Sequence, residues 1–281
     1  TSKVLAYLKL VGEATGRDIQ EVLGEKKEIV DKVLAHLMRE GLVLRKNRMY
    51  IAVKKADWKN EFPTLSPEVP FKVPYFNDVA HFNYGDMILL GGRSKVGKTT
   101  QAMNIIKRFV AQGVKPHYMY LETGSRFLKT ALTLGLKEGD FYHAFVSDPT
   151  KVELEKNAVT ILDWLLIDNY AETDKVLKYF VEQLNKTNGF LIIFMQLKDG
   201  DTWFAPNMIH FFPAMAARYV YDKVETGYGT TGAWVIDAVR DPKNHSKGGN
   251  LPCTYDWVNK TLKLNGEINE KEERKDEDRP F

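Results

Sequence analysis

The spacing of hydrophobic positions changes repeatedly along residues 80–265, as it does where strands and helices alternate. Continuous apolar runs, typical of strands buried on both faces, are MILLGG, PHYMYLE, AVTILDWLLID and FLIIFMQ. Between them, TQAMNIIKRFVAQG and AETDKVLKYFVEQLNKTN carry apolar residues at helical spacing. RYVYDKV and AWVIDAVR are predicted as further strands, and YDWVNKTLKL as a last edge strand. This alternation predicts an α/β domain with a mostly parallel sheet and helices on both faces.

Residues 1–55 show a separate and smaller pattern. VLAYLKLVG, GRDIQEVLG and EKKEIVDKVLAHLMREG predict three helices, of which Thr15 caps the second. The apolar face predicted for the third helix consists of Ile29, Val33, Leu34, Leu37 and Met38. LVLRKNRMYIAV predicts a β-hairpin that turns at Lys46 and Asn47. Three helices and a hairpin resemble a winged helix-turn-helix domain, whose third helix usually enters a DNA major groove.

Charge in this N-terminal region is consistent with such a role. Residues 1–60 hold 13 Lys or Arg and 8 Asp or Glu, a net charge of +5. Basic residues in the predicted third helix and the hairpin are candidates for phosphate contacts: Lys26, Lys27, Arg45, Lys46 and Arg48. Acidic residues are mixed with the lysines of the third helix, so a protein partner stays as open as a nucleic acid.

Two segments differ from these domains. Residues 56–79 contain four prolines, which exclude a helix or a central strand, and they predict a linker. Its aromatic residues are too apolar for a free tether, so part of it is expected to lie on the second domain. Residues 266–281 have no apolar periodicity, carry 7 acidic and 4 basic residues, and predict a disordered tail. The tail is similar to the tips of single-stranded DNA-binding proteins, a likeness that implies docking to a replication protein; a solvated tail without a partner is the competing interpretation.

Composition indicates the class of the protein and its expected cellular compartment. The 281 residues are 44% hydrophobic and 27% charged, as in ordinary soluble proteins. No apolar run approaches the ~20 residues that span a membrane, and no signal-peptide pattern is visible. The single cysteine, Cys253, excludes an internal disulfide and fits a reducing compartment. A cytoplasmic location without membrane contact is expected.

The sequence GGRSKVGKTT, residues 91–100, contains the phosphate-binding motif G-x-x-x-x-G-K-T between a predicted strand and a predicted helix. Backbone N–H groups of such a loop and the following helix N-terminus favour anions. Lys98 can reach the β- and γ-phosphates, and the Thr99 hydroxyl can bind Mg²⁺. ATP and Mg²⁺ are therefore predicted, with these nucleotide-binding residues: Gly92, Arg93, Ser94, Lys95, Val96, Gly97, Lys98, Thr99 and Thr100.

Polar residues follow three later strands in the order YLET, TILDWL and IFMQLK. Together with the phosphate loop, over roughly residues 80–265, this order resembles the RecA-like ATPase core of DnaB-type helicases and their phage and plasmid relatives. The resemblance implies that Glu122 polarises the attacking water, that Asp163 holds the Mg²⁺ shell, and that Gln196 senses the γ-phosphate. Asp168, which also follows four largely apolar residues, is the alternative to Asp163, and Glu122 as a helix N-cap is the alternative to its catalytic role.

The chain departs from the DnaB pattern near its last strands. Those helicases place a lysine and an arginine two residues apart to reach a neighbouring subunit's γ-phosphate. Here AVRDPKNH keeps Arg240, the candidate finger, while Ala238 stands at the lysine's position and Lys243 is a possible substitute. A surface arginine at a strand end is the competing interpretation.

The segment after Gln196, LKDGDTWFAPNMIHFF, corresponds to a region that faces the central channel in RecA-like motors. Lys198 is a candidate phosphate contact, and Trp203 and Phe204 are candidates for stacking on bases. Packing under a neighbouring subunit explains the two aromatic residues equally well.

The resemblance implies a Mg²⁺-dependent ATPase of a DNA replication or recombination system: a helicase, a loader or a recombinase-like protein. Single- or double-stranded DNA and a homo-oligomeric ring or filament are the expected partners, with hydrolysis at a subunit interface. The alternative is a KaiC-like ATP-binding regulator whose winged helix is a DNA- or protein-binding switch. A small-molecule kinase fits less well, because Gln196 has no obvious use there.

Overall fold

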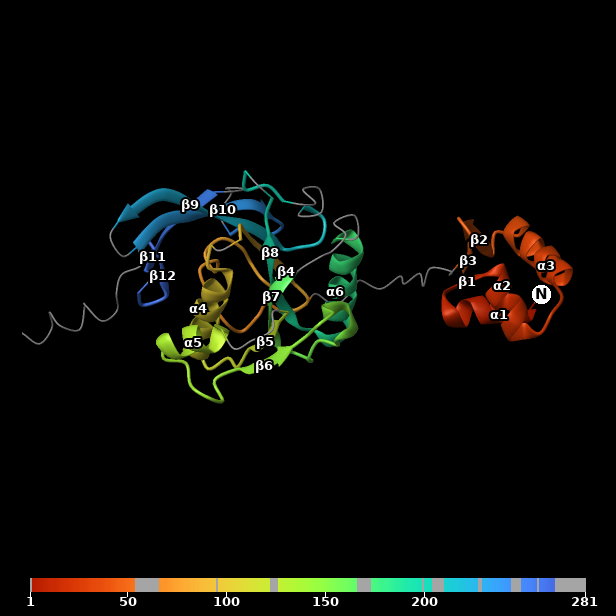
Figure 1. Ribbon diagram of the computed structural model, residues 1–281, viewed down its shortest axis with the longest axis horizontal. Helices are drawn as coiled ribbons and strands as arrows, with labels where there is room; N and C mark the ends of the chain where they lie inside the picture. Colours follow the sequence, from red (N-terminus) through yellow and green to blue (C-terminus); the bar gives the residue numbers. More distant parts are fainter. Residues whose placement is uncertain are drawn as a thin grey trace, which may run out of the picture. The chain divides into compact units, whose positions relative to one another are not determined.

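The computed structural model describes residues 2–53, 66–94, 96–121, 126–165, 173–198, 200–203, 210–226, 229–243, 249–256 and 258–265. The chain divides into two compact units, Thr1–Thr64 and Leu65–Phe281 (Figure 1). Among the described residues, no helix is long and apolar enough to cross a bilayer.

The described part of the first unit combines helices with a small antiparallel sheet. Its elements are α1 (Ser2–Val11), β1 (Glu13–Thr15), α2 (Gly16–Leu23), α3 (Lys27–Arg39), β2 (Val43–Lys46) and β3 (Met49–Ala52), and the sheet order is β1-β3-β2. Thr15 caps α2 as predicted, because its hydroxyl accepts from the Asp18 N–H while the Asp18 carboxylate accepts from the Thr15 N–H. The core gathers apolar side chains from the helices and the sheet, among them Leu8, Ile19, Leu34, Leu37 and Val43.

Three details of this unit differ from the sequence prediction. The buried face of α3 includes Val30, whereas Ile29 is 47% exposed, so the predicted face is rotated by about one residue. The hairpin turns at Asn47 and Arg48, since Lys46 already pairs with Met49. Asn47 adopts φ of 58°, a left-handed conformation that asparagine tolerates better than most residues. Strand β1, which pairs with β3, was not predicted because three residues carry no readable periodicity.

In the described part of the second unit, nine strands form one mixed, mostly parallel sheet in the order β12-β11-β10-β9-β4-β8-β7-β5-β6. The parallel strands are β4 (Met87–Gly92), β5 (His117–Tyr120), β6 (Tyr142–Phe145), β7 (Val159–Leu165), β8 (Phe190–Gln196) and β9 (Met215–Thr226). Antiparallel strands extend it: β10 (Gly229–Val239), β11 (Gly249–Asp256) and β12 (Thr261–Leu264). The predicted α/β class with a mostly parallel sheet is confirmed.

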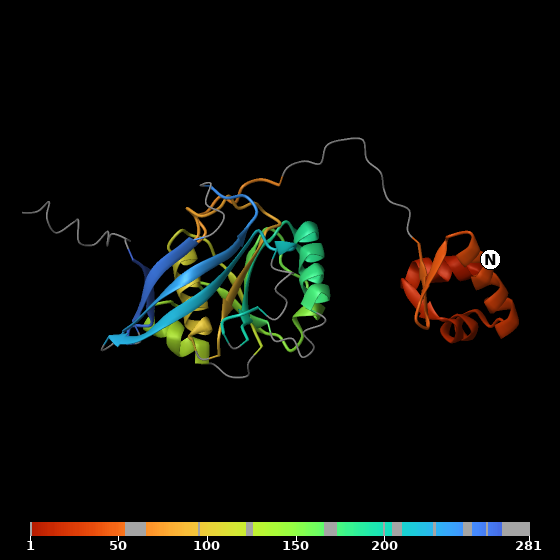
Figure 2. The same cartoon turned by 90° about the horizontal axis from the view of Figure 1, so that it is seen from above.

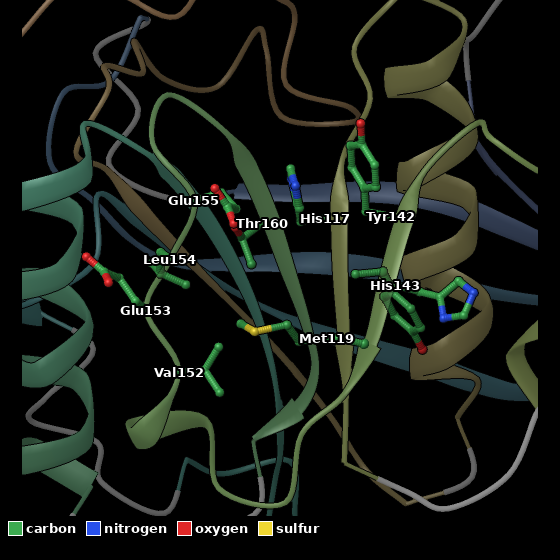
Figure 3. Close-up of a pocket in the computed structure, with 11 residues that line it drawn as sticks. His117, Met119, Tyr142, His143, Val152, Glu153, Leu154, Glu155 and Thr160 are labelled. Atoms are coloured by element: carbon green, nitrogen blue, oxygen red, sulfur yellow. The ribbon is translucent and has the colours of Figure 1, made fainter.

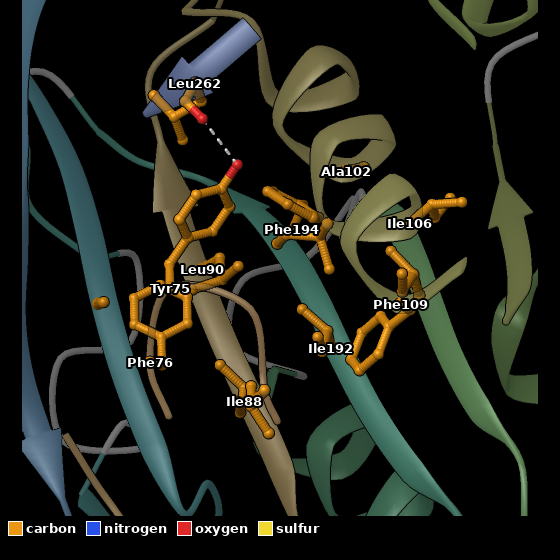
Figure 4. Packing of buried hydrophobic residues seen from close by; sticks show 14 of the residues in the cluster. Tyr75, Phe76, Ile88, Leu90, Ala102, Ile106, Phe109, Ile192, Phe194 and Leu262 are labelled. Carbon is orange, nitrogen blue, oxygen red and sulfur yellow. Dashed lines mark hydrogen bonds between the residues drawn. The ribbon is translucent and has the colours of Figure 1, made fainter. Parts of the chain in front are cut away.

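Helices cover both faces of this sheet (Figure 2). Helices α4 (Lys98–Val110) and α5 (Arg126–Thr133) pack on one face, and α6 (Thr173–Thr187) packs on the other; a short helix, η1 (Pro149–Lys151), precedes β7. Alternate residues of β4 point to opposite faces of the sheet. Ile88 and Leu90 pack on the α4 side, and Met87 and Leu89 pack on the α6 side. Figure 4 shows the α4 side, where Ile106 and Phe109 pack over the sheet.

Residues 66–79, the second half of the predicted linker, contribute several side chains to the core of the second unit. Tyr75 and Phe76 are buried, and the Tyr75 hydroxyl donates a 3.1 Å hydrogen bond to the Leu262 carbonyl (Figure 4). The Phe76 ring meets Trp234 edge-on, with centroids 5.5 Å apart. These aromatic residues therefore anchor the incoming chain on the sheet.

One strand prediction is wrong in detail, and one strand was not predicted. YDWVNKTLKL is not one edge strand: β11 ends at Asp256 and β12 begins at Thr261, so the segment forms part of a hairpin. Asp256 explains the turn, because its carboxylate accepts from the backbone N–H groups of Val258 and Asn259. Edge strand β6 was not predicted, since all of its residues are exposed and it has no buried face to read.

Candidate nucleotide-binding site

The phosphate-binding motif connects β4 to α4, the strand-to-helix context that the motif requires. Gly97 caps α4 with φ of 82°, a left-handed conformation that favours glycine. At Gly92 a Cβ would lie 2.9 Å from Val96 Cγ2, so a larger residue would force the loop open. The backbone conformation thus favours glycine at position 97, and the close approach of Val96 favours it at position 92.

Lys98, the lysine of the motif, is only 5% exposed although it carries a charge. Its ammonium donates hydrogen bonds to the carbonyls of Gly92, at 3.2 Å, and Arg93, at 2.8 Å. These bonds compensate for the burial of the charge and hold it inside the loop. A phosphate entering the loop would find this positive charge already in place.

Gln196 and Asp163 come from strands beside the loop. Gly92 pairs with Gln196 across the β4–β8 ladder, and β7 follows β8 in the sheet. Asp163 is 5% exposed, and its Oδ2 accepts a 2.7 Å hydrogen bond from the Tyr118 hydroxyl. It alternates with Leu162, which faces α6, so Asp163 lies on the α4 side of the sheet. The tertiary structure thereby brings two predicted residues to the edge that carries the loop.

The residues present fit the Mg²⁺ site expected of a phosphate loop. Among the described residues no group of three His, Cys, Asp or Glu side chains could hold a metal ion by itself. A nucleotide-bound Mg²⁺ does not need such a group, since it takes phosphate oxygens and water and adds one or two protein ligands. Thr99, in the first turn of α4, would supply the hydroxyl, and Asp163 would accept from Mg²⁺-bound water.

The β11–β12 hairpin closes one side of the loop, a feature that the sequence did not predict. The Asn104 amide of α4 donates to the Lys260 carbonyl at 2.7 Å, and its oxygen accepts from the Leu262 N–H at 3.2 Å. A Cβ on Gly97 would lie 3.7 Å from the Tyr255 hydroxyl. No sequence signal links Asn104 to strands more than 150 residues away, because the contact depends on the strand order.

Arg93 of the motif makes a second contact across the sheet edge. Its guanidinium binds the Asp201 carboxylate with two hydrogen bonds, Nε to Oδ1 at 2.6 Å and Nη2 to Oδ2 at 2.8 Å. Asp201 lies in the turn after β8, which was predicted to contact nucleic acid.

Arg240 lies near the amino end of β4, whereas Gly92 lies at its carboxyl end. It follows Val239, which pairs with Met215, and Met215 in turn pairs with Ile88 near the start of β4. Its guanidinium donates to the Phe211 carbonyl. Burial raises the pKa of Asp86, just before β4, and the positive charge of Arg240 opposes that rise. Arg240 is therefore separated from the phosphate loop of its own chain by the length of β4.

Trp203 was predicted either to stack on bases or to pack against protein, and in the structure described its ring is buried. The side chain is 6% exposed, and its Nε1 donates to Asp237 Oδ2 at 2.7 Å. A Cβ on Gly91 would lie 2.9 Å from Trp203 Cη2, so the ring packs directly on the end of β4. Packing within its own chain explains this aromatic residue.

The other candidate nucleic-acid contacts are exposed side chains. Lys198 is exposed in the turn after β8, and the rest lie on the first unit: Lys26, Lys27, Arg45, Lys46 and Arg48. Arg45 donates from Nε to the Asn47 carbonyl at 3.1 Å and lies over the Tyr50 ring. Lys95, Glu122, Asp168 and Phe204 lie outside the described residues, so their predicted roles stay predictions.

A separate cavity of about 160 Å³ lies at the amino ends of β5 and β7 (Figure 3). His117, Glu155 and Thr160 line one end of it, and Met119 and Val152 lie toward the other. Burial lowers the pKa of His117, although Glu155 opposes this, so the imidazole is neutral at pH 7. His117 pairs with Thr160, and Thr160 pairs with Leu191 opposite Met87, so the cavity lies away from the Gly92 edge.

Comparisons with family models and with curated proteins do not place this chain in a known class. No protein-family model matches the chain, and no curated protein matches it at a significant level. What the fold and the site define is an α/β protein with a strand–loop–helix phosphate-binding motif at the carboxyl edge of its sheet.

Proposed function

We propose that this chain binds ATP with Mg²⁺ at the phosphate loop and hydrolyses it in a nucleic-acid-dependent reaction. The observation that carries the proposal is the position of Lys98, whose buried ammonium is held in the loop by the carbonyls of Gly92 and Arg93. A cation fixed in this way, in a loop whose N–H groups also favour anions, attracts phosphate without having to rearrange. The triphosphate of a nucleotide suits such a loop.

A RecA-like core is the form of ATPase that the sheet supports best. The phosphate strand β4 lies between β8 and β9, and Gln196 ends the neighbouring strand in register with Gly92. An amide at this place can sense a γ-phosphate and move with it, because it is one strand away from the loop. Asp163 on the next strand adds an acid on the α4 side.

Each residue would contribute a different part of phosphoryl transfer to water, which needs positioning and charge neutralisation more than covalent chemistry. Mg²⁺ would supply positive charge at the phosphate oxygens when bound. Lys98 would hold the phosphate chain by charge, Thr99 and Asp163 would orient the ion and its waters, and Glu122 would orient the attacking water.

The first unit is proposed to be a winged-helix domain that contacts nucleic-acid phosphates. Its β2–β3 turn presents Arg45, Lys46 and Arg48 as exposed cations, and the sheet order β1-β3-β2 beside helices α1 to α3 fits that class. Such contacts would hold DNA without reading its sequence.

Hydrolysis measured with and without single-stranded DNA tests the proposal on the full chain. Stimulated release of phosphate from ATP is expected, and absence of ATP binding would contradict the proposal as a whole. The burial of Trp203 favours a second candidate, an ATP-binding regulator of KaiC-like fold, because it removes one expected nucleic-acid contact. ATP binding with hydrolysis indifferent to DNA would favour that regulator.

A further inference from the structure

The phosphate loop and the turn after β8 are joined by one ion pair whose partners are 108 residues apart in the sequence. The Arg93 guanidinium donates two hydrogen bonds to the Asp201 carboxylate, of 2.6 and 2.8 Å. The Arg93 side chain is 41% exposed and that of Asp201 is 19% exposed. Water, or a phosphate, therefore reaches the arginine more easily than the aspartate.

The turn that presents Asp201 is tightly built. The Lys198 N–H donates to the Thr202 carbonyl at 2.8 Å, which closes the turn. Asp201 has φ of 59°, a left-handed conformation that is uncommon outside glycine. Arg218 of β9 holds it there, because Nη1 donates to the Asp201 carbonyl at 2.6 Å. A residue kept in a sparsely populated conformation by its surroundings is often functional.

Beside the turn lies a second ion pair, whose side chains are less exposed, at 23% and 15%. Arg218 binds Asp237 through two hydrogen bonds, at 2.6 and 2.8 Å, and Trp203 donates to the same carboxylate. The hydrogen bond to Asp237 raises the pKa of Arg218. Asp201 is thus held by Arg218 of the sheet, whereas Arg93 belongs to the phosphate loop.

A bound nucleotide would conflict with this arrangement. Asp201 places a negative charge beside a loop that is proposed to accept phosphates, and it occupies the Nε and Nη2 donors of the loop's own arginine. A guanidinium pairs equally well with a carboxylate or a phosphate, but the same two donors serve only one of them in this geometry.

We propose that Arg93 and Asp201 form a nucleotide-sensitive latch. Phosphates entering the loop take Arg93 from Asp201 and so remove the ion pair between the loop and the turn, while the hydrogen bond from the Leu197 N–H to the Gly92 carbonyl remains. The contacts of the turn then depend on whether nucleotide is bound. This inference rests on the proposed nucleotide site. Coupling of this kind is reciprocal, so a partner that draws the turn away from Arg93 tightens nucleotide binding by the same factor.

A double-mutant cycle on the full chain tests the latch. Binding of a non-hydrolysable ATP analogue with Mg²⁺ is measured by calorimetry for the wild type, Asp201→Asn, Arg93→Ala and the double variant. Asp201→Asn is expected to bind about fivefold more tightly or better, because the nucleotide no longer breaks a half-buried ion pair. In the Arg93→Ala background most of that gain should disappear. Glu21→Gln, which breaks an exposed Arg17 ion pair in the first unit, is the matched control and should change nothing.

Each alternative outcome has a distinct meaning. Equal or weaker binding by Asp201→Asn would overturn the latch, since Asp201 would then be neutral or would support Arg93. An equal gain with and without Arg93 would also overturn it, because simple repulsion by the carboxylate would explain the result. A wild type that binds no nucleotide would instead overturn the proposed site, and the latch with it.

Hydrogen exchange on the wild type gives a test that needs no variant. The Lys198 amide, which closes the turn, is expected to exchange faster after the ATP analogue is added. The Leu191 amide, bonded to Asp86 at the other end of β8, should keep its rate. An unchanged rate at Lys198 with saturating nucleotide would contradict the latch.

Discussion

Lys98 and Arg93 are two cations of one loop that are held in opposite ways. Lys98 is buried and donates hydrogen bonds to the backbone carbonyls of Gly92 and Arg93, which hold the ammonium inside the loop. Arg93 is paired with a carboxylate and is partly exposed. The first arrangement suits a constant attraction for phosphate, and the second suits a contact that changes with occupancy.

Replacing Lys98 is expected to abolish hydrolysis without unfolding the chain. In Lys98→Ala, ATP turnover should fall about a hundredfold or more, because loss of one preorganised cation at the transferring phosphate has effects of that size. Phosphate release is the measurement, and circular dichroism checks the fold. Lys107→Ala, on an exposed site of the same helix, is the control. Normal turnover in a folded Lys98→Ala protein would remove the loop from the mechanism.

The two candidate Mg²⁺ acids can be separated by substitution. If Asp163 holds the Mg²⁺ shell, Asp163→Asn should lower activity about 10–100-fold, as substitutions of residues that orient metal ligands do. Asp168→Asn should then have a much smaller effect. Activity is measured over a range of Mg²⁺ concentrations, since a weakened ion site is partly rescued by excess metal. The reverse order of the two variants would assign the role to Asp168.

At the scale of elements, α4 is the connection between the phosphate loop and the C-terminal strands. Asn104 binds the β11–β12 hairpin from the same helix that begins at Lys98, and the Asp256 turn orders that hairpin. Burial raises the pKa of the Tyr255 hydroxyl, which therefore stays protonated beside Gly97 over the physiological range. The hairpin therefore packs beside the loop on one side, while Asp201 lies on the other.

Removing the Asn104 amide should destabilise this connection. Asn104→Ala leaves the buried Leu262 N–H without its acceptor, and an unsatisfied buried group of this kind costs about 1–3 kcal/mol. Urea unfolding followed by circular dichroism measures the free energy of unfolding, with Lys107→Ala as the control on the same helix. A free energy of unfolding that does not fall would show that the Asn104 amide does not stabilise the hairpin, which would then be held by its pairing with β10 and by its apolar contacts.

At the scale of the whole molecule, the two units differ in what they offer to partners. The second unit holds the proposed nucleotide site, and its expected base-stacking residue Trp203 is buried. The first unit exposes a cluster of cations on the β2–β3 turn. Contact with nucleic acid is therefore assigned mainly to the first unit under the proposed function.

Charge removal on the β2–β3 turn should weaken DNA binding in a salt-dependent way. A full-length variant with Arg45, Lys46 and Arg48 changed to Ala is expected to bind less tightly. The slope of log affinity against log salt should become shallower by about 0.9 for each DNA phosphate that the variant no longer neutralises. Fluorescence anisotropy of labelled DNA at several salt concentrations measures the slope.

The matched control changes exposed lysines of the second unit to Ala: Lys129, Lys137 and Lys156. Its slope should equal that of the wild type. If both triple variants give the wild-type slope, the first unit does not bind DNA phosphates and is better explained as a protein-contact module.

Several features of this protein were determined by its sequence alone because they are local. The phosphate loop is contiguous, and its glycines and lysine act on neighbours within six residues. The capping of α2 by Thr15 and the alternation of buried strands with amphipathic helices are equally local, so periodicity and motif spacing were enough to predict them. The one-residue errors at Ile29 and at the β2–β3 turn arise because a pattern locates a face or a turn less exactly than contacts do.

Only the tertiary structure decided which distant residues meet. Asp201 reaches Arg93 and Trp203 packs under Gly91 because β8, β4 and β9 are neighbours in the sheet. Asn104 reaches the β11–β12 hairpin because β10, β11 and β12 extend the sheet beyond β9. Strand order and register set those contacts, and neither is written in the spacing of apolar residues along one segment. The loop that can hold a phosphate is thus a property of the local sequence, whereas the ion pair between Arg93 of that loop and Asp201 is a property of the fold.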